Sequence, residues 1–532
     1  MKISFNKDGL TGSILYSSED WLAGMDTSSA GSNYGKMGGN PFMSEIDPLR
    51  AFGYVSPSYN GVAATNNGSI TRILRNAVVN GADAFIVSGG ALNSGSGSGD
   101  ANIQKFTIAT ATISTSSFPH TIAHSGHSNV SGDDINHYYT TSGSLAAIKA
   151  FYSFEDATDW DIGTLTYPST FNDSYMSTTA VGSASFVTTQ IAGQGYPHPL
   201  ITGDNDIMYI GDRNFVHSYD RSTNTFSLAE LTLPLGWIIT CFTRTQDLRL
   251  AIGAYFTTTA ASSGVYNRGQ AKVFLWTYDN LDFDYAIDLK DNYVSEIIPW
   301  TNTIAAFTYG RKTLSDKGPN KLQVLNGTQF EVVKTWGSSG SALELPVRGG
   351  VDNVGNDLYW SAAGQVFAYT KRPDNGQYIL NQLVTVGSAS GLLKFFSASS
   401  IYSASFGVTT DGLQSFTSNY NDAGNLNCQV ATPDWPILMK GNLSRISIKF
   451  KDTFSGGRTL RLLSRIDDGN TILIDDFQSS SVLRLIQIQS RTNGSPLGTF
   501  SSLQPQLIWA DNGTGSDRET ACPVVEYVKY DF

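Results

Sequence analysis

The stretch NDIMYIGDRNFVHSYD, residues 205–220, is the clearest copy of a phrase that recurs along this chain. It joins an alternating apolar run, a turn rich in Gly, Asp and Asn, and a second alternating run. Similar phrases occur about seven times between roughly residue 83 and residue 410, including LRLAIGAYF from Leu248 and NDLYWSAAGQVFAYTK from Asn356. Self-similarity at a spacing of this size is typical of repeat architectures.

The spacing of the copies indicates the size of the repeating unit. Successive centres are separated by roughly 43 to 63 residues, which suits about four short strands with their loops, the size of a propeller blade. The sequence therefore predicts an all-β chain with a seven-bladed β-propeller, and six or eight blades are the alternatives. The centres lie near Phe85, Ile148, Met208, Ala251, Ala306, Tyr359 and Val408.

Within each phrase the apolar period is two, which indicates strands. The run DIMYIG from Asp206 is apolar on both faces and predicts a strand buried between stacked sheets, whereas the mixed run NFVHSYD from Asn214 predicts an outer strand. A ring closes most firmly when its last sheet takes strands from both chain ends. We therefore expect the segment near 60–75 to pair beside the blade at about 405–420.

The composition agrees with a chain of strands and turns. Among 532 residues, 15% are charged, 12% are aromatic and 52 are Gly, which is typical of a turn-dense all-β protein. The net charge is −11, and the cluster of basic residues at 458–465 alternates as a solvated strand face does. These features argue against sequence-specific nucleic-acid binding.

The cysteines and the N-terminal segment predict the cellular compartment in which the chain folds. Cys241, Cys428 and Cys522 are too few and too widely spaced for a disulfide framework, which favours folding in a reducing cytosol. Cys241 lies in the apolar run GWIITCFTR and is interpreted as a core residue. The N-terminus lacks the apolar segment of a signal peptide, and no stretch is long and apolar enough for a membrane span.

Three parts are expected along the chain. Residues 1–60 are rich in Gly, Ser and Pro but carry several aromatic side chains, and predict an extended arm that wraps along the folded body or a neighbouring subunit. Residues 61–425 hold the repeats. Residues 426–532 form longer, strictly alternating strands with hairpin turns and predict a small β-sandwich. The aromatic residues of the arm are Trp21, Phe42, Phe52 and Tyr54.

Two groups of side chains could bind metals. A run of His with neighbouring Asp has donors that suit zinc, but its Ser/Gly/Asn context favours an ordinary loop. Recurring acidic turns carry oxygen donors, but none has the spacing of a calcium loop, so the interpretation as turn-stabilising residues is preferred. The first group is His120, His124, His127, His137, Asp133 and Asp134, and the second includes Asp204, Asp206, Asp279, Asp282 and Asp284.

The segment RIDDGNTI, residues 465–472, is similar to the Asp box of sialidases in Asp467, Gly469 and Thr471. The Ser and Trp of that box are replaced by Arg465 and Ile472, so an Asp-Gly hairpin turn is the better interpretation. A nucleophile elbow, a P-loop and a Rossmann fingerprint are all missing. No catalytic, cofactor-binding or metal-binding residue is therefore assigned, and the chain is predicted not to be an enzyme.

Taken together, the opening arm with DPLRAFGYVSP at 47–57, the repeats, RIDDGNT at 465–471 and the final PVVEYVKYDF at 523–532 resemble virion proteins of tailed bacteriophages. The similarity is to propeller-bearing tail components, including nozzle proteins. It implies a non-enzymatic structural protein of the phage tail, without a cofactor, assembled in the host cytoplasm. The implied partners are copies of the chain in a ring and other phage tail proteins.

Two alternative functions follow from the same sequence. One is a receptor module for host-surface glycans, with Trp276, Trp300 and Trp360 as conceivable stacking residues. The other is a propeller glycoside hydrolase, which needs two carboxylates a few ångströms apart. Sequence alone does not identify such a pair, because the two residues could come from different blades.

Overall fold

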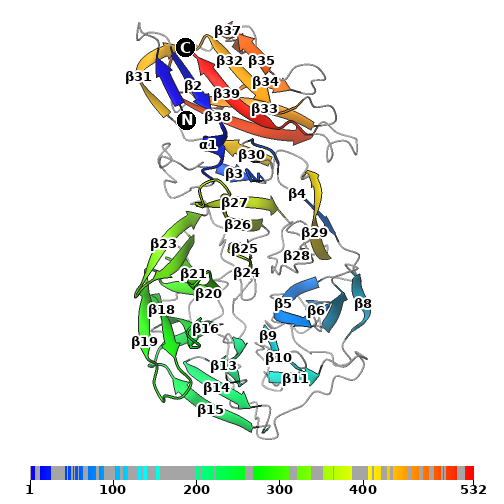
Figure 1. Cartoon of the computed structure of the whole chain (residues 1–532), viewed down its shortest axis with the longest axis vertical. Coiled ribbons are helices and arrows are strands. Elements are labelled where there is room, and N and C mark those ends of the chain that lie inside the picture. The colour runs from blue at the N-terminus through cyan, green and yellow to red at the C-terminus, as the bar shows by residue number, and fades with distance from the viewer. Residues whose placement is uncertain are drawn as a thin grey trace, which may run out of the picture. The chain divides into compact units, whose positions relative to one another are not determined.

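The computed structural model is all-β, and α1 (Ser18–Trp21) is the only helix among the residues that it describes (Figure 1). The described residues are 2–5, 12–24, 42–44, 46–49, 52, 54–57, 59–63, 70–79, 83–88, 102–107, 112–117, 129–132, 136–140, 151–155, 199–203, 205, 207–212, 214–220, 223, 225–257, 268–310, 320–336, 351–362, 365–385, 405–409, 412–420, 428–431, 435–452, 458–466, 471–477, 485–489, 491–492, 495–496, 499–511 and 522–532.

Small sheets follow one another along the first four fifths of the chain. The first is β5 (Ile70–Val79), β6 (Asp83–Ser88), β7 (Asn102–Thr107) and β8 (Thr112–Ser117), in this order. The second is β9 (Asn129–Gly132), β10 (Asn136–Thr140) and β11 (Phe151–Glu155). The third is β12 (Leu200–Thr202), β13 (Met208–Asp212), β14 (Phe215–Asp220) and β15 (Thr225–Thr232).

The next three sheets repeat the four-stranded order. They are β16 (Trp237–Arg244), β17 (Leu250–Thr257), β18 (Arg268–Trp276) and β19 (Tyr285–Leu289); then β20 (Tyr293–Trp300), β21 (Thr303–Tyr309), β22 (Asn320–Asn326) and β23 (Gln329–Trp336); then β24 (Val351–Val354), β25 (Asp357–Ala362), β26 (Gln365–Lys371) and β27 (Tyr378–Thr385). Because each strand pairs with the next one in sequence, these sheets are meanders, as short alternating runs with tight turns predict.

A three-stranded sheet combines segments from distant parts of the chain. Its order is β28 (Ser405–Thr409), β29 (Gly412–Tyr420) and β4 (Tyr59–Ala63). The predicted pairing of the segment near 60–75 with the phrase near 405–420 is therefore confirmed for β4, whereas residues 70–75 belong to β5 in another sheet.

The first strands of successive sheets are neighbours. β5 contacts β9, β9 contacts β12, β12 contacts β16, β16 contacts β20 and β20 contacts β24. β28 in turn contacts β5, the first strand of the first sheet.

The predicted phrase centres fall within strands wherever the structure describes them. Five lie in the second strand of a four-stranded sheet, and Val408 lies in β28; Ile148 is outside the described residues. The five are Phe85, Met208, Ala251, Ala306 and Tyr359.

Burial along the phrase at 205–220 confirms one prediction and corrects another. Met208, Tyr209 and Ile210 in β13 are buried on both faces, as predicted. The run NFVHSYD, however, is not an outer strand, because β15 pairs with its far side. His217 and Ser218 in β14 are buried because they bond to β15: the Ala229 amide donates to His217 Nδ1 at 3.0 Å, and the Ser218 hydroxyl donates to Glu230 Oε1 at 3.2 Å.

The remaining strands form two larger sheets. One has the order β1 (Lys2–Phe5), β2 (Gly12–Tyr16), β39 (Val525–Asp531), β32 (Arg445–Phe450) and β35 (Leu485–Gln489). The other has the order β3 (Phe42–Ser44), β30 (Cys428–Ala431), β38 (Thr499–Asp511), β33 (Arg458–Ile466) and β34 (Thr471–Phe477), with β31 (Trp435–Asn442) also on β38. A short hairpin joins β36 (Arg491–Thr492) and β37 (Ser495–Pro496).

Side chains of these two sheets contact one another across their buried faces. The Tyr16 hydroxyl donates to the Leu503 carbonyl at 3.1 Å, and the hydroxyls of Ser464 and Tyr530 are 3.0 Å apart. The rings of Phe450 and Phe477 meet edge to face, with their centroids 5.9 Å apart. Each contact joins one sheet to the other, as in two layers with a shared apolar core.

The N-terminal segment is more regular than the expected extended arm. β1 and β2 pair with each other, and β2 pairs with β39, which is the last strand of the chain. Ile14 and Tyr16 are fully buried there. Residues 12–16, GSILY, alternate as a strand does, but the run is short and lies between Gly and Ser residues, so the sequence does not clearly predict this strand.

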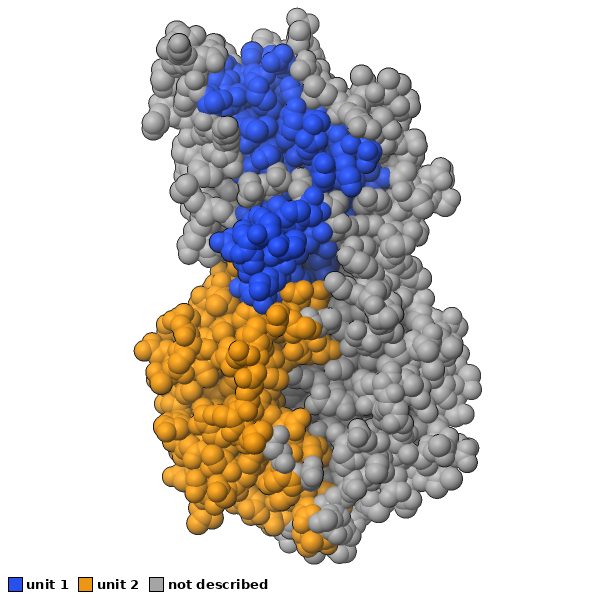
Figure 2. Space-filling view, viewed as in Figure 1, with its two compact units in different colours: residues 1–62, 365–385, 416–532 blue, residues 63–364, 386–415 orange. Residues whose placement is uncertain are grey.

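Contacts between Cα atoms divide the chain into two compact units (Figure 2). Unit 1 comprises residues 1–62, 365–385 and 416–532, and unit 2 comprises residues 63–364 and 386–415. The division into 1–60, 61–425 and 426–532 stays a prediction. In the part of the chain that the structure describes, no helix has the length and apolar character needed to cross a membrane.

Candidate functional site

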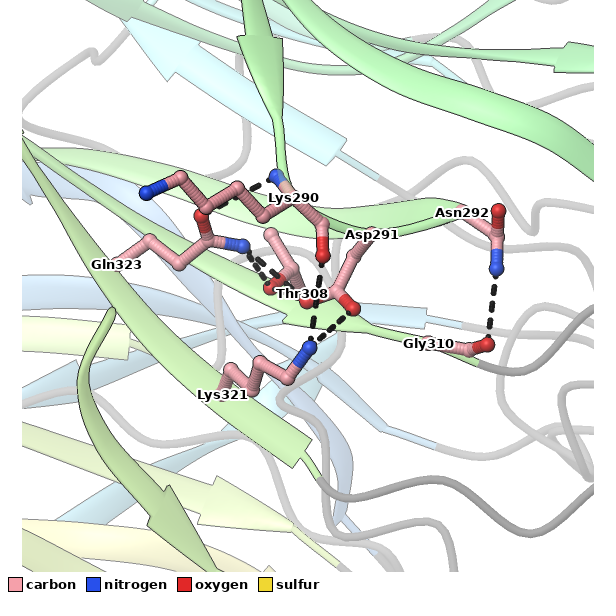
Figure 3. A network of polar contacts seen from close by, with 7 residues as sticks. All are labelled: Lys290, Asp291, Asn292, Thr308, Gly310, Lys321 and Gln323. Atoms are coloured by element: carbon pink, nitrogen blue, oxygen red, sulfur yellow. Dashed lines mark hydrogen bonds and ion pairs between the residues drawn. The ribbon is translucent and has the colours of Figure 1, made fainter. Parts of the chain in front are cut away.

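Among the described residues, the most extensively bonded buried carboxylate belongs to Asp291, in the turn between β19 and β20 (Figure 3). Lys321 Nζ donates to Asp291 Oδ1 at 2.7 Å. The Thr308 hydroxyl and the Gln323 side-chain amide donate to Asp291 Oδ2 at 2.6 and 3.1 Å. One carboxylate thus connects a turn to two neighbouring strands, β21 and β22.

The strand period explains how these side chains come together. Lys321 and Gln323 are two residues apart on β22 and therefore point to the same face. Thr308 on β21 pairs directly with Lys321. The Gln323 amide also donates to the Thr308 hydroxyl at 2.7 Å, and Gln323 Oε1 accepts the Lys290 amide at 3.3 Å.

Burial sets the electrostatics of this cluster. The Asp291 side chain is 2% exposed and that of Lys321 is 20% exposed. Burial raises the pKa of Asp291 above its ordinary value, and the hydrogen bonds and charge of Lys321 oppose this shift without cancelling it. The ammonium group is held further by the Lys290 carbonyl, which accepts from Lys321 Nζ at 3.4 Å.

The arrangement is suited to holding backbone together. Both carboxylate oxygens already accept hydrogen bonds from the protein, and the nearest cation is fixed by the same carboxylate and by a main-chain carbonyl. A general base must instead direct a lone pair at a substrate proton. Asn292 adds to the same turn, since its side-chain amide donates to the Gly310 carbonyl at 2.8 Å (Figure 3).

A second cluster surrounds Tyr209 in β13. Asn205 Nδ2 donates to the Tyr209 hydroxyl at 2.8 Å, and the rings of Trp276 and Tyr278 lie 5.4 and 5.0 Å from the Tyr209 ring, centroid to centroid. Burial raises the pKa of Tyr209 to about 12. Asn205 stands in the acidic turn GDNDI and stabilises that turn; Asp204 and Asp206 lie outside the described residues.

The acidic turn at 277–284 also uses its side chains locally. Asp284 Oδ1 accepts from the Thr277 hydroxyl at 3.4 Å and from the Asn280 amide at 3.3 Å. Trp276 Nε1 donates to the Asn280 carbonyl at 2.7 Å. Among the residues with described side chains, no group of three His, Cys, Asp or Glu is placed to hold a metal ion.

The other predicted metal donors lie mostly outside the described residues. His120, His124, His127, Asp133 and Asp134 are all in this class. The remaining member, His137, lies in β10 and pairs with Gly132 of β9 and Phe154 of β11. The interpretation of these residues as an ordinary loop therefore stays a prediction.

The tryptophans considered as glycan-stacking residues are buried. Trp276, Trp300 and Trp360 are 1%, 7% and 0% exposed, so none presents a ring face to solvent. Trp300 Nε1 donates to the Asn356 carbonyl at 2.6 Å, and the rings of Trp336 and Trp360 lie 5.1 Å apart. Their burial excludes these three rings as glycan-stacking residues and agrees with the expectation that a Trp in a strand belongs to the core.

The segment RIDDGNTI lies between paired strands, as a hairpin requires. Arg465 in β33 pairs with Thr471 in β34, and Ser464 pairs with Ile472; Asp467 and Gly469 are outside the described residues. Cys241 and Cys522 are buried free thiols, and Cys428 lies in β30.

Sequence reasoning did not single out the Asp291 cluster. The available signal was polar residues at alternate positions of otherwise apolar strands: NKLQV, residues 320–324, and AFTY, residues 306–309. Such residues must find polar partners when the strand is buried. What the sequence does not reveal is which turn supplies the carboxylate.

Comparison with known proteins assigns no family. No protein-family model and no curated protein matches the sequence. Among solved structures, virginiamycin B lyase from Staphylococcus aureus is similar over 67% of this chain and 98% of its own, with 12% identity and a TM-score of 0.43. YCF48 from Cyanidioschyzon merolae is similar over 67% of this chain and 99% of its own, with 8% identity and a TM-score of 0.41. Similarities this distant carry no information about the activity of this chain. The description of its fold therefore rests on the observed sheets.

Proposed function

We propose that this chain is a non-enzymatic structural component of a bacteriophage virion, a nozzle, tip or hub protein of the tail that assembles in copies as a ring. The proposal is carried by the observation that the buried polar groups of this chain bond to one another and hold its strands and turns together. The Asp291 carboxylate, the best bonded among the described residues, joins a turn to two strands of one sheet and so serves the scaffold.

The proposed architecture is a seven-bladed propeller with a small sandwich. Seven sheets can be followed along residues 59–420 among the described strands, and the first strands of the first six touch in succession from β5 to β24. The contact of β28 with β5 and the pairing of β29 with β4 support closure of the ring. The side-chain contacts of the sheet of β39 with the sheet of β38 support the sandwich.

The virion assignment is drawn from the resemblance of sequence segments to phage tail proteins. A ring of blades leaves only short, protected sheet edges. This suits a particle that must stay folded outside the cell, because unpaired edges promote aggregation. Polar side chains fixed within sheets, such as Thr308 and Gln323, add rigidity to the same scaffold.

The proposal is tested on purified phage particles. An antibody against the chain should label one end of the tail in electron micrographs, and mass spectrometry of the particles should detect the chain in several copies. A chain absent from purified particles, or a purified chain that cleaves host-surface polysaccharide, would contradict the proposal. Capsule polysaccharide incubated with the chain, followed by sizing of the products, provides the second measurement.

A further inference from the structure

One end of the sheet β16–β19 presents apolar side chains to solvent among acidic ones. Leu281 is 93% exposed, Tyr285 is 63% exposed and Leu248 is 62% exposed. Asp279 and Asp282 are exposed beside Leu281 in the same turn. We call these five residues the acidic patch. Exposed apolar side chains gathered among polar ones are typical of protein interaction sites.

Strand register places the members of the acidic patch at the same end. Leu250 pairs with Trp276, so the turn that holds Leu248 lies beside the turn at 277–284. Tyr285 pairs with Leu275, one residue before Trp276. The guanidinium of Arg249 lies 5.7 Å above the Tyr285 ring and connects the first turn to β19.

The backbone of both turns is strained. Leu248 has φ of 64° and Tyr278 has φ of 71°, in the left-handed region that non-glycine residues rarely adopt. Such conformations cost free energy and are found where function fixes them.

The acidic patch carries uncompensated charge. Arg249 pairs with Asp247 and Lys272 pairs with Asp288, but no described cation forms a salt bridge with Asp279 or Asp282. A partner for this surface must therefore supply cations together with apolar or aromatic side chains.

A face of unit 1 has that chemistry. Lys449 Nζ lies 5.7 Å above the Tyr527 ring, and Lys451 Nζ lies 5.2 Å above the Tyr54 ring. Phe52, two residues before Tyr54, is 42% exposed. We call these five residues the lysine patch.

Backbone contacts hold the lysine patch together. The Lys451 amide donates to the Val524 carbonyl at 2.9 Å, and Val55 and Val525 exchange both backbone hydrogen bonds, at 2.8 and 3.0 Å. Lys449 is neutralised by Glu526, with Nζ and Oε1 2.7 Å apart. Lys451 is exposed and forms no salt bridge with a described carboxylate.

We infer that the acidic patch of one copy of this chain binds the lysine patch of a second copy. The two surfaces differ and lie in different units, so the contact is heterologous: each copy uses its acidic patch on one neighbour and its lysine patch on the other. Repetition of such a contact generates a closed ring or an open filament. The inference rests on the proposed function, in which copies of the chain assemble, and it names the two surfaces through which they bind.

Sedimentation of the purified full chain over a range of concentrations and salt tests this contact. Association is expected to weaken as salt rises, because the pairing charges are exposed. Leu281→Asp should reduce the association constant about tenfold or more, as loss of a buried interface anchor does. Leu228→Asp is the matched control: Leu228 is 44% exposed on β15, outside both patches, and association should be unchanged.

A charge exchange identifies the pairing surfaces directly. Asp282→Lys and Lys451→Glu should each weaken association, and the double variant should recover a large part of the loss. Copies that associate equally well with and without these substitutions would overturn the proposed contact while leaving assembly in copies intact. A chain that stays monomeric at every concentration and salt would overturn the contact too, and its presence in several copies per phage particle then decides the proposed function separately.

Discussion

At the scale of single residues, the Lys321 ammonium group compensates the buried charge of the Asp291 carboxylate. Replacing Lys321 with Met would leave the Asp291 carboxylate, whose side chain is 2% exposed, without its cation. Removing one partner of a buried pair costs about 3 to 5 kcal/mol. We expect a loss near the lower end of this range in the free energy of unfolding for Lys321→Met, because the Lys321 side chain is 20% exposed. Urea denaturation followed by tryptophan fluorescence measures it.

Lys272→Met is the matched control for this substitution. Lys272 pairs with Asp288, whose side chain is 61% exposed, so solvent screens that interaction. Surface pairs contribute about 0 to 1 kcal/mol, and the control should change stability little. Equal losses for the two variants would show that burial of Asp291 is not what makes its pair important.

The raised pKa of Asp291 has a consequence for the pH dependence of stability. Because burial raises the folded-state pKa above the ordinary 3.8, the folded protein binds this proton more tightly than the unfolded chain does. The associated stability is present below pH 3.8 and is lost as the pH rises through the folded-state pKa. The wild type should therefore lose stability relative to Asp291→Asn as the pH increases over this window.

Unfolding free energies of the wild type and Asp291→Asn, measured across the acidic range, test this sign. The comparison subtracts the groups that both proteins share. A wild type that gains stability relative to the variant as the pH rises would mean that Lys321 outweighs the burial of the carboxylate.

At the scale of elements, β16 and β17 depend on a glycine opposite a cysteine. Gly253 pairs with Cys241, and a Cβ atom at position 253 would overlap with Cys241 Sγ. Gly253→Ala should therefore destabilise the protein by about 1 to 3 kcal/mol, as overfilling of a core does. Thermal or urea unfolding gives the value.

A double-mutant cycle separates this overlap from other effects of the substitution. Cys241→Ala removes the sulfur and creates the space that the added methyl group needs. The double variant should lose less stability than the sum of the two single variants. Additive losses would point instead to the backbone preference of Gly253 or to contact with Val294, whose Cγ1 lies 3.4 Å from the same Cβ position.

Much of the element order could be predicted from sequence, because local alternation and turn residues determine meanders. The phrase at 205–220 gave strands in the expected positions, and the pairing of β4 with β29 followed from the logic of ring closure. Strand layering was harder. β14 contains His217 and Ser218 and was predicted as an outer strand, since their bonds to Ala229 and Glu230 of β15 are invisible in a sequence.

The candidate site was less predictable than the strands. The acidic turn is conspicuous in the sequence, but its residues Asp279, Asp282 and Asp284 stabilise or border that turn. Asp291 was not predicted as a site residue, yet its carboxylate accepts the most hydrogen bonds among the described carboxylates. Its partners are Thr308, Lys321 and Gln323, which meet it only after two strands have paired. Contacts of this kind depend on tertiary packing, so the local pattern does not contain them.

At the scale of the whole molecule, both ends of the chain stabilise one sheet. A chain that begins at residue 17 would lack β1 and β2 and would expose the flank of β39 that β2 covers. Burial of Ile14 and Tyr16 contributes about 1.5 to 3 kcal/mol for each side chain, so the truncated chain should melt at a lower temperature.

A synthetic peptide of residues 1–16 should restore the melting temperature of the truncated chain by pairing with β39. The same peptide with Ile14→Lys and Tyr16→Lys is the control, because its charged side chains cannot enter the core. Calorimetric scans measure both effects. A truncated chain with the melting temperature of the full one would contradict a stabilising role for β2.

The pairing of first and last strands also imposes an order of events during synthesis. Tyr16 bonds to Leu503, a residue 487 positions further along the chain. A ribosome that adds about 5 to 20 residues per second takes on the order of a minute to cover that interval. The sheets of β12 to β23 can form as they emerge, while β2 has only β1 as a partner until β39 is made. The sheet that joins β2 to β39 is therefore completed only after the meanders between them have been synthesised.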